Sequence, residues 1–194
     1  MTAPLIRPAT VDDVDTLCRL GAATFRETYR PISDPREVDD YADEHFTRAR
    51  IEAWLHRTDA RTLLASLADA PVGYAHVRRA AVPDCVADPE AVELSRLYLL
   101  GSAQGVGLGS ALMAEAIAQI AALGARTAWL GAYDRNVKAL AFYARHGFVQ
   151  AGTHAFEFGG RIHADPVLTR AVTPAARGPS IIRASQNIPR RLPR

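Results

Sequence analysis

Glycine dominates a short segment between a predicted strand and a predicted helix, Gln104, Gly105, Val106, Gly107, Leu108, Gly109 and Ser110. The start of a helix presents unpaired amides and a partial positive charge, and glycines let a phosphate approach the backbone closely. The segment therefore predicts a pyrophosphate site, although a flexible turn would have the same composition. No Gly-Lys-Ser/Thr sequence follows it, which excludes a Walker loop. No acidic residue ends the next strand, as dinucleotide binding requires.

A second group of polar side chains follows the next predicted strand. Asn136 and Tyr143 lie seven residues apart in a predicted helix over 136–146, so their side chains share one face. A tyrosine phenol, with a pKa of about 10, can donate a proton to a departing group. Taken singly, the simpler interpretations are a helix cap for Asn136 and a core aromatic for Tyr143.

Together the two segments resemble the GCN5-related N-acetyltransferase (GNAT) superfamily. Its Q/R-x-x-G-x-G/A motif matches residues 104–109, and its N-x-x-A-x-x-F-Y-x-x-x-G-F pattern matches residues 136–148. The resemblance is strongest over 93–148 and extends over 4–171. Upstream, the residues around 24–29 and 41–46 look like those of the PaiA-type spermidine/spermine acetyltransferases.

The resemblance implies that acetyl-CoA is the acetyl donor and binds between two splayed strands, 92–99 and 127–132. The backbone of Leu97, Tyr98 and Leu99 would pair with the pantetheine. Amides of the glycine segment would hold the pyrophosphate, from Gln104, Gly105, Val106, Gly107, Leu108, Gly109 and Ser110. Asn136 would contact the cofactor arm, and Tyr143 would lie near the thioester sulfur.

Acetyl transfer to an amine requires a base and an acid. A polyamine nitrogen has a pKa near that of lysine, about 10.4, so it must lose a proton before it attacks a thioester. Glu93 is four residues before Leu97 on the same predicted strand, which predicts that both lie on one face and that Glu93 acts through water. A charge pair with Arg96 or Arg126 explains Glu93 equally well. By its motif, Tyr143 is the acid that protonates the departing thiolate.

Acidic walls suit a cationic amine, and the segment between 24 and 46 supplies several acids. The resemblance locates the acceptor site in this region, which makes Glu27, Tyr29 and Glu44 the substrate-binding candidates. Solvated surface positions explain the two acids as well, and core packing explains Tyr29.

The predicted elements follow the order β-α-α-β-β-β-α-β-α-β-β. This order predicts an α+β or mixed α/β fold and argues against a doubly wound Rossmann sheet. The resemblance implies a mostly antiparallel central sheet that splays at the cofactor cleft and is flanked by helices. One N-acetyltransferase domain is expected over 1–171. Residues 172–194, with five arginines and no acid, are predicted to form a disordered basic tail.

The composition is that of one globular domain, because 48% of the 194 residues are hydrophobic and 23% are charged. Net charge is +2, and −3 once the five tail arginines are set aside, so no nucleic-acid partner is expected. No apolar stretch reaches the ~18 residues of a membrane span, and Arg7 comes too early for a signal peptide. Cys18 and Cys85 have no zinc-ligand spacing, so we expect no metal and a cytoplasmic location.

These observations predict an acetyl-CoA-dependent enzyme that acetylates a primary amine of a small molecule, with a polyamine as one candidate acceptor. Two alternatives stay open at this point. One is acetylation of a protein or peptide amine, and the other is a non-catalytic acyl-CoA-binding module. The expected partners are the small amine and, as an option, a second copy of the chain in a homodimer.

Overall fold

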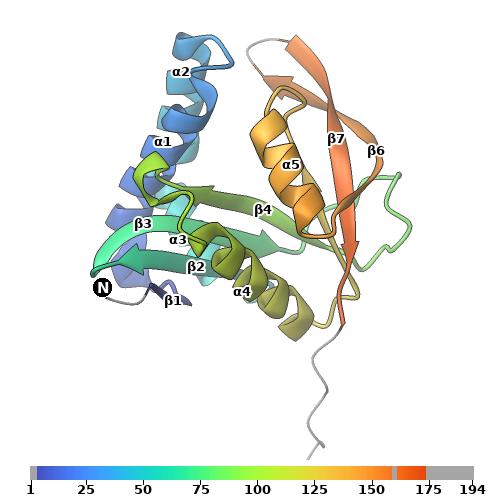
Figure 1. The fold of residues 1–194 in the computed structure, drawn as a ribbon, viewed down its shortest axis with the longest axis horizontal. Coiled ribbons are helices and arrows are strands. Elements are labelled where there is room, and N and C mark those ends of the chain that lie inside the picture. Colours follow the sequence, from blue (N-terminus) through green and yellow to red (C-terminus); the bar gives the residue numbers. More distant parts are fainter. Residues whose placement is uncertain (1–3, 159–160, 174–194) are drawn as a thin grey trace, which may run out of the picture.

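A single seven-stranded sheet runs through the computed structural model, which describes residues 4–158 and 161–173 (Figure 1). The strand order is β1-β2-β3-β4-β5-β7-β6, and every neighbouring pair is antiparallel except the parallel pair β4 and β5. The fold is therefore of the predicted mixed α/β class. The strands are β1 (Leu5–Pro8), β2 (Ala60–Leu67), β3 (Ala70–Arg78), β4 (Val92–Leu99), β5 (Thr127–Gly131), β6 (Val149–Phe158) and β7 (Arg161–Ala171).

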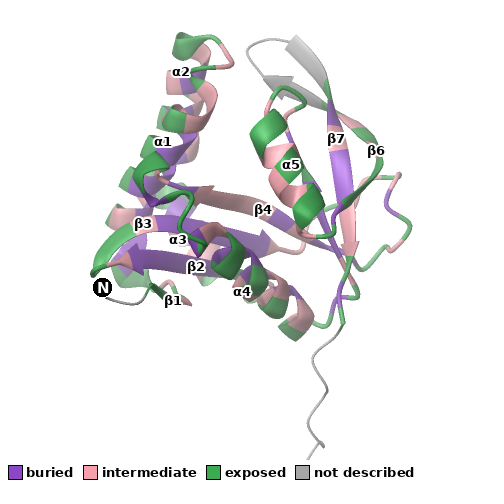
Figure 2. Ribbon diagram, in the orientation of Figure 1, coloured by how far each residue is buried: buried purple, intermediate pink, exposed green. Residues whose placement is uncertain are grey.

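Helices cover both faces of the sheet. On one face, Ile51 of α3 and the apolar side of α1 pack against Leu64 and Tyr74. On the other face, α4 packs through Leu112 and Met113. Strands β2 and β3 lie between these layers and are buried along most of their length (Figure 2). The helices are α1 (Val14–Tyr29), α2 (Pro35–His45), α3 (Arg48–His56), α4 (Leu108–Ala122) and α5 (Val137–Arg145).

Capping residues explain where α2 and α3 begin. The Asp34 carboxylate accepts a hydrogen bond from the Arg36 amide at 2.8 Å, and Pro35 occupies the first turn of α2. The Thr47 hydroxyl accepts from the Arg50 amide at 3.5 Å at the start of α3. Thr47 thus separates α2 from α3. None of the described helices is long and apolar enough to cross a membrane.

Strands β4 and β5 pair only at their beginnings. Their register holds two residue pairs, Val92 with Ala128 and Glu93 with Trp129. After that point β4 continues beside β3, and β5 continues beside β7. The sheet therefore opens between them, which confirms the predicted splay. Helix α5 follows β5 at this opening, and none of its residues is fully buried (Figure 2).

The packed core continues one residue past β7. Val172 is 7% exposed and belongs to the same apolar cluster as α4. Its amide donates to the carbonyl of Arg126 at 2.7 Å. The expected domain limit at 171 therefore leaves out a core residue. The remainder of the predicted tail, 174–194, lies outside the described residues.

Candidate active site

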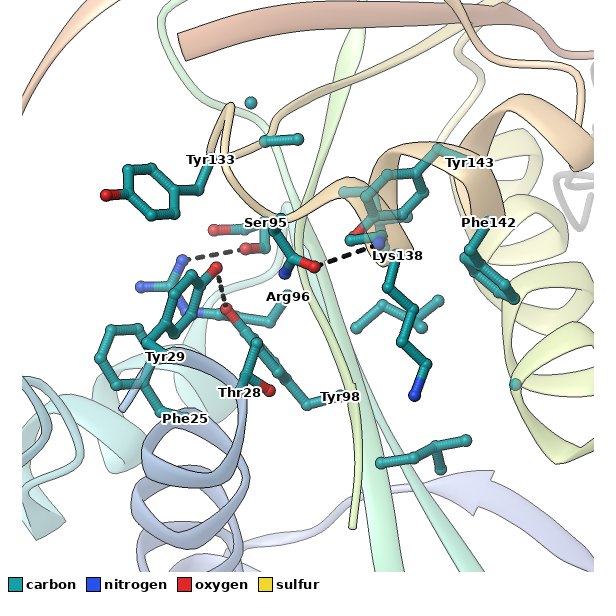
Figure 3. A pocket seen from close by; sticks show the side chains of 18 of the residues that line it. Phe25, Thr28, Tyr29, Ser95, Arg96, Tyr98, Tyr133, Lys138, Phe142 and Tyr143 are labelled. Carbon is teal, nitrogen blue, oxygen red and sulfur yellow. Dashed lines mark hydrogen bonds between the residues drawn. The ribbon is translucent and has the colours of Figure 1, made fainter. Parts of the chain in front are cut away.

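A cleft of about 1570 Å³ opens where β4 and β5 separate. Its walls come from α1, the part of β4 from Glu93 to Leu99, the glycine segment, the end of β5 and α5. Figure 3 shows the two sides of this cleft, with Tyr143 and Lys138 on one side and Tyr29 and Arg96 on the other. Segments far apart in the chain therefore meet in one concave site.

The glycine segment leaves its backbone open. Gly105 and Gly107 have φ angles of 81° and 86°, a region that favours glycine, and Gly107 is the residue before α4. A Cβ built on either residue would meet no atom within 4 Å. The start of α4 is thus accessible to an anion, as the sequence predicts.

A lysine crosses from α5 to the glycine segment. The Lys138 ammonium donates to the side-chain oxygen of Gln104 at 2.5 Å, and the amide nitrogen of Gln104 donates to the Leu99 carbonyl at 3.2 Å. Sequence reasoning did not select Lys138, although it is the only lysine in the chain and lies two residues after Asn136. It brings a positive charge next to the predicted phosphate site.

Asn136 and Tyr143 both line the cleft, but their side chains have different surroundings. The Asn136 side-chain oxygen accepts from the Ala139 amide at 3.1 Å, so it caps α5. The Tyr143 ring packs edge-on against Phe142 and Phe148. Burial raises the pKa of the Tyr143 phenol, which therefore keeps its proton at neutral pH.

The prediction that Glu93 shares a face with Leu97 is wrong. A bulge in β4 shifts the register with β3, so that Leu94 pairs with Val77 and Arg96 with His76, leaving Ser95 without an opposite residue. The extra residue reverses the alternation. Leu94 and Leu97 then pack in the same apolar cluster, and Glu93 points to the opposite face.

Glu93 has a cationic partner other than the two considered from the sequence. Its carboxylate accepts from the Arg78 guanidinium at 2.6 Å, and its side chain is only 13% exposed. Both residues still line the cleft. The pair accounts for Glu93 as an ion-pair partner, and its role as a base stays a prediction.

Aromatic rings form the other side of the cleft, next to α1 and α2 (Figure 3). The hydroxyls of Tyr29 and Tyr98 are 3.2 Å apart, and Phe25 stacks on Tyr41 with ring centroids 4.6 Å apart. Burial raises the pKa of both Tyr29 and Tyr98, so both hydroxyls stay protonated. This wall combines apolar surface with hydroxyl groups, as suits a small organic acceptor.

The two acids proposed for the acceptor site have different positions. Glu27 lines the cleft, where its carboxylate accepts from the Gly101 amide at 2.8 Å. Glu44 is 66% exposed, pairs with Arg50 at 3.0 Å and is not among the residues that line the cleft. The structure therefore brings Glu27 and Tyr29 together and leaves Glu44 on the outer surface.

Most residues expected at the cofactor line the cleft. Leu108 is a core residue at 1% exposure and Val106 is 67% exposed, and neither is among the residues that line the cleft. The predicted cofactor residues that line the cleft are Leu97, Tyr98, Leu99, Gln104, Gly105, Gly107, Gly109, Ser110, Asn136 and Tyr143.

A model of the acetyltransferase (GNAT) family matches residues 23–148, a range that contains the glycine segment, α5 and the aromatic wall. The chain belongs to the GNAT acetyltransferase family. This confirms the family predicted from the two motifs, and the chain is accordingly an N-acetyltransferase.

Similar proteins and solved structures agree with the assignment of this chain to the GNAT family. A Mycobacterium tuberculosis protein named as an uncharacterized N-acetyltransferase is 34% identical over 158 residues, which are 81% of this chain and 97% of that protein. The structure of the PaiA N-acetyltransferase from Thermoplasma acidophilum in complex with coenzyme A has a TM-score of 0.73 at 19% identity, covering 88% of this chain and 99% of that one. A GCN5-related N-acetyltransferase from Rhodopseudomonas palustris has a TM-score of 0.69 at 21% identity, covering 89% and 98%. These structures share the GNAT fold.

Proposed function

We propose that this GNAT chain transfers the acetyl group of acetyl-CoA to a primary amine of a small molecule. The observation that carries the proposal is the cleft between β4 and β5, which joins the open glycine segment and Tyr143 to the aromatic wall. A protonated phenol able to act as an acid at this junction favours an enzyme over a non-catalytic acyl-CoA-binding module.

The residues of the cleft fit acetyl-CoA. The open amides before α4 and the nearby Lys138 charge suit a pyrophosphate. The β4 edge beyond Glu93 is not paired with β5, which leaves backbone groups for the pantetheine amides. Acetyl-CoA, when bound, supplies an acetyl group activated as a thioester.

The chain's own residues then move protons. The acceptor ammonium loses one proton to a base and its nitrogen attacks the acetyl carbon, forming the C–N bond as the C–S bond breaks. The Tyr143 hydroxyl donates its proton to the sulfur and regains one from the acylated nitrogen, so one proton is released in total. Glu93 is the candidate base and would act through water while held by Arg78.

Among small amines, a polyamine is the acceptor suggested by the resemblance of residues 24–46. The described acids give this narrower choice little support, because Glu27 is occupied by a backbone amide and Glu44 lies outside the cleft. A protein or peptide amine is the second candidate acceptor within the GNAT family. An acceptor panel separates the two.

The test is thiol release from acetyl-CoA with a panel of polyamines, amino acids, aminoglycosides and peptides. We expect at least one class of small primary amine to be acetylated with mass-spectrometric formation of its N-acetyl product. Acetyl-CoA binding without product from any amine would support the non-catalytic module instead. Turnover with peptides alone would move the acceptor to proteins.

A further inference from the structure

Arg96 is a cation of the acceptor wall that the chemistry above does not use. It lies on β4 directly after the bulged Ser95 and lines the cleft (Figure 3). Its guanidinium donates to the Ser95 carbonyl at 2.9 Å and to the Tyr41 hydroxyl at 3.0 Å. Its Nε is buried and has no hydrogen-bond partner among the described residues.

The surroundings of Arg96 are aromatic and uncharged. Burial desolvates its guanidinium, and the ionisable groups that act on its pKa are the phenols of Tyr29, Tyr41, Tyr74 and Tyr98. No carboxylate of the described residues forms an ion pair with it. Elsewhere in these ranges the chain does pair its half-buried arginines, as with Arg26 and Asp39 at 2.9 Å. A desolvated guanidinium without an anion is unfavourable, which marks a place for an anion from outside the chain.

We propose that Arg96 binds a carboxylate of the acceptor, so that the substrate is an amine that also carries a carboxylate, such as an amino acid. The proposal rests on the proposed function, because it names the acceptor class for the same cleft. A guanidinium presents a planar set of donors that matches a carboxylate, and the neighbouring hydroxyls of Tyr29, Tyr41 and Tyr98 add further donors.

The position of Arg96 is compatible with a small acceptor. Arg96 and Tyr143 both line the cleft, on its two opposite sides (Figure 3). The carboxylate site and the catalytic phenol therefore face one space. In an amino acid the amine and the carboxylate are a few bonds apart, so one molecule reaches both.

The other charges of the cleft agree with an anionic acceptor. The cleft is lined by more cations than acids, and its three acids, Glu27, Glu93 and Asp165, each accept a hydrogen bond from the chain. A polycation in this space would meet Arg96, while the carboxylates on the described walls already have partners within the chain. The cations that line the cleft are Arg50, Arg78, Arg96, Arg135, Lys138 and Arg145.

The first test uses the unmodified full chain and matched acceptors. We expect kcat/KM for the best amino acid to exceed that for its carboxamide, which has the same skeleton without the charge, by about 100-fold or more, because a site built for a polar group rejects the analogue that lacks it. Polyamines should react still more weakly. Equal or better turnover of carboxamides or polyamines would overturn the proposal while leaving the acetyltransferase function intact.

The second test removes the guanidinium. Arg96→Gln should lower kcat/KM about 100-fold for the amino acid, leave the carboxamide nearly unchanged and leave the KM for acetyl-CoA unchanged. Arg30→Gln, which removes the same charge from a residue paired with Asp39 and outside the cleft lining, is the matched control and should retain amino-acid turnover. A parallel fall for both acceptors in Arg96→Gln would indicate a structural role and refute the carboxylate site.

Two further measurements distinguish a failure of the carboxylate site from misfolding of the variant and from a failure of the proposed function. Thermal unfolding reports whether Arg96→Gln is folded, and if it is not, the matched acceptors on the unmodified chain decide the question. If no amine at all is acetylated, the proposed function fails. Calorimetric titration of the same amino acids into the unmodified chain would then decide the carboxylate site, since binding no tighter than that of the carboxamides would refute it.

Discussion

Tyr143 is the residue whose contacts bear most directly on the reaction. Its ring is held by Phe142 and Phe148, so Tyr143→Phe should retain the fold and the affinity for acetyl-CoA. Turnover should fall roughly 10²-fold, the lower end of the range for a lost general acid, because a thiolate leaves easily. Steady-state kinetics with the best acceptor checks this, and unchanged turnover would return Tyr143 to a packing role.

Gly107 tests the phosphate site, with Gly124 at the other end of α4 as the control. Gly107 and Gly124 lie at opposite ends of α4, have φ angles of 86° and 81° and have open space around a built Cβ. Alanine at either residue should lower stability by about 1–2 kcal/mol through backbone strain. Only Gly107→Ala should weaken acetyl-CoA binding, by roughly 10–100-fold for one lost charge-assisted contact. Calorimetry showing equal affinity in both variants would remove the pyrophosphate assignment.

Single residues also show what the sequence could and could not predict. The motif spacing selected Asn136, Tyr143 and glycines that line one cleft, because this spacing depends on helical and turn geometry, and their roles at the cofactor stay predictions. The predicted orientation of the Glu93 side chain was wrong because a bulge at Ser95 adds a residue to β4, and no local sequence pattern reveals this bulge. Arg96 had a signal in the sequence, a cation close to Leu94, Leu97 and Tyr98, but its lack of an acid partner among the described residues depends on the packing of α1 and α2.

At the scale of elements, α3 packs on the β2–β3 pair around a buried histidine. His76 is 1% exposed, stacks on Trp54 and shares a hydrogen bond of 2.9 Å with Thr62. Burial, with the charges of Arg78, Arg96 and Arg57, lowers the pKa of His76 to about 3. In the unfolded chain the His76 imidazole therefore binds a proton near pH 6.5, whereas in the folded chain it does not, so acid favours unfolding.

The burial of neutral His76 makes the stability of the protein depend on pH. The contribution of neutral His76 is complete above pH 6.5 and is lost between pH 6.5 and about 3, by up to about 1.4 kcal/mol per pH unit. His76→Gln, which does not titrate, should show a shallower decline over this window. Urea unfolding at several pH values measures both slopes, and parallel slopes would mean that His76 is accessible to protons in the folded state.

The elements themselves follow largely from local signals. The strand predicted over 92–99 has the observed bounds, and Thr47 divides α2 from α3 as its capping ability indicates. The separation of β4 from β5 has no local signal, because it depends on which strands become neighbours. It was predicted only through the family resemblance.

At the scale of the whole molecule, the limit of the packed chain can be measured with two truncations. A chain that ends at Thr173 retains Val172, whereas one that ends at Ala171 loses this buried side chain and its hydrogen bond to Arg126. The shorter chain should melt roughly 3–10 °C lower, from the burial of one valine, while the longer one keeps the melting temperature of the full chain. A lower melting temperature for the chain ending at Thr173 would show that residues 174–194 contribute to folding.

The partial pairing of β4 also predicts a pattern of deuterium uptake. From Arg96 to Leu99 the strand has β3 on one edge and the gap on the other, and successive amides of a strand point to opposite edges. Amides toward the gap should therefore exchange quickly in the free protein, and those toward β3 slowly. If a bound pantetheine lies along the gap as one more strand, coenzyme A should slow exchange at every second amide. A uniform change along β4, measured residue by residue, would mean that the ligand stabilises the sheet without lining its edge.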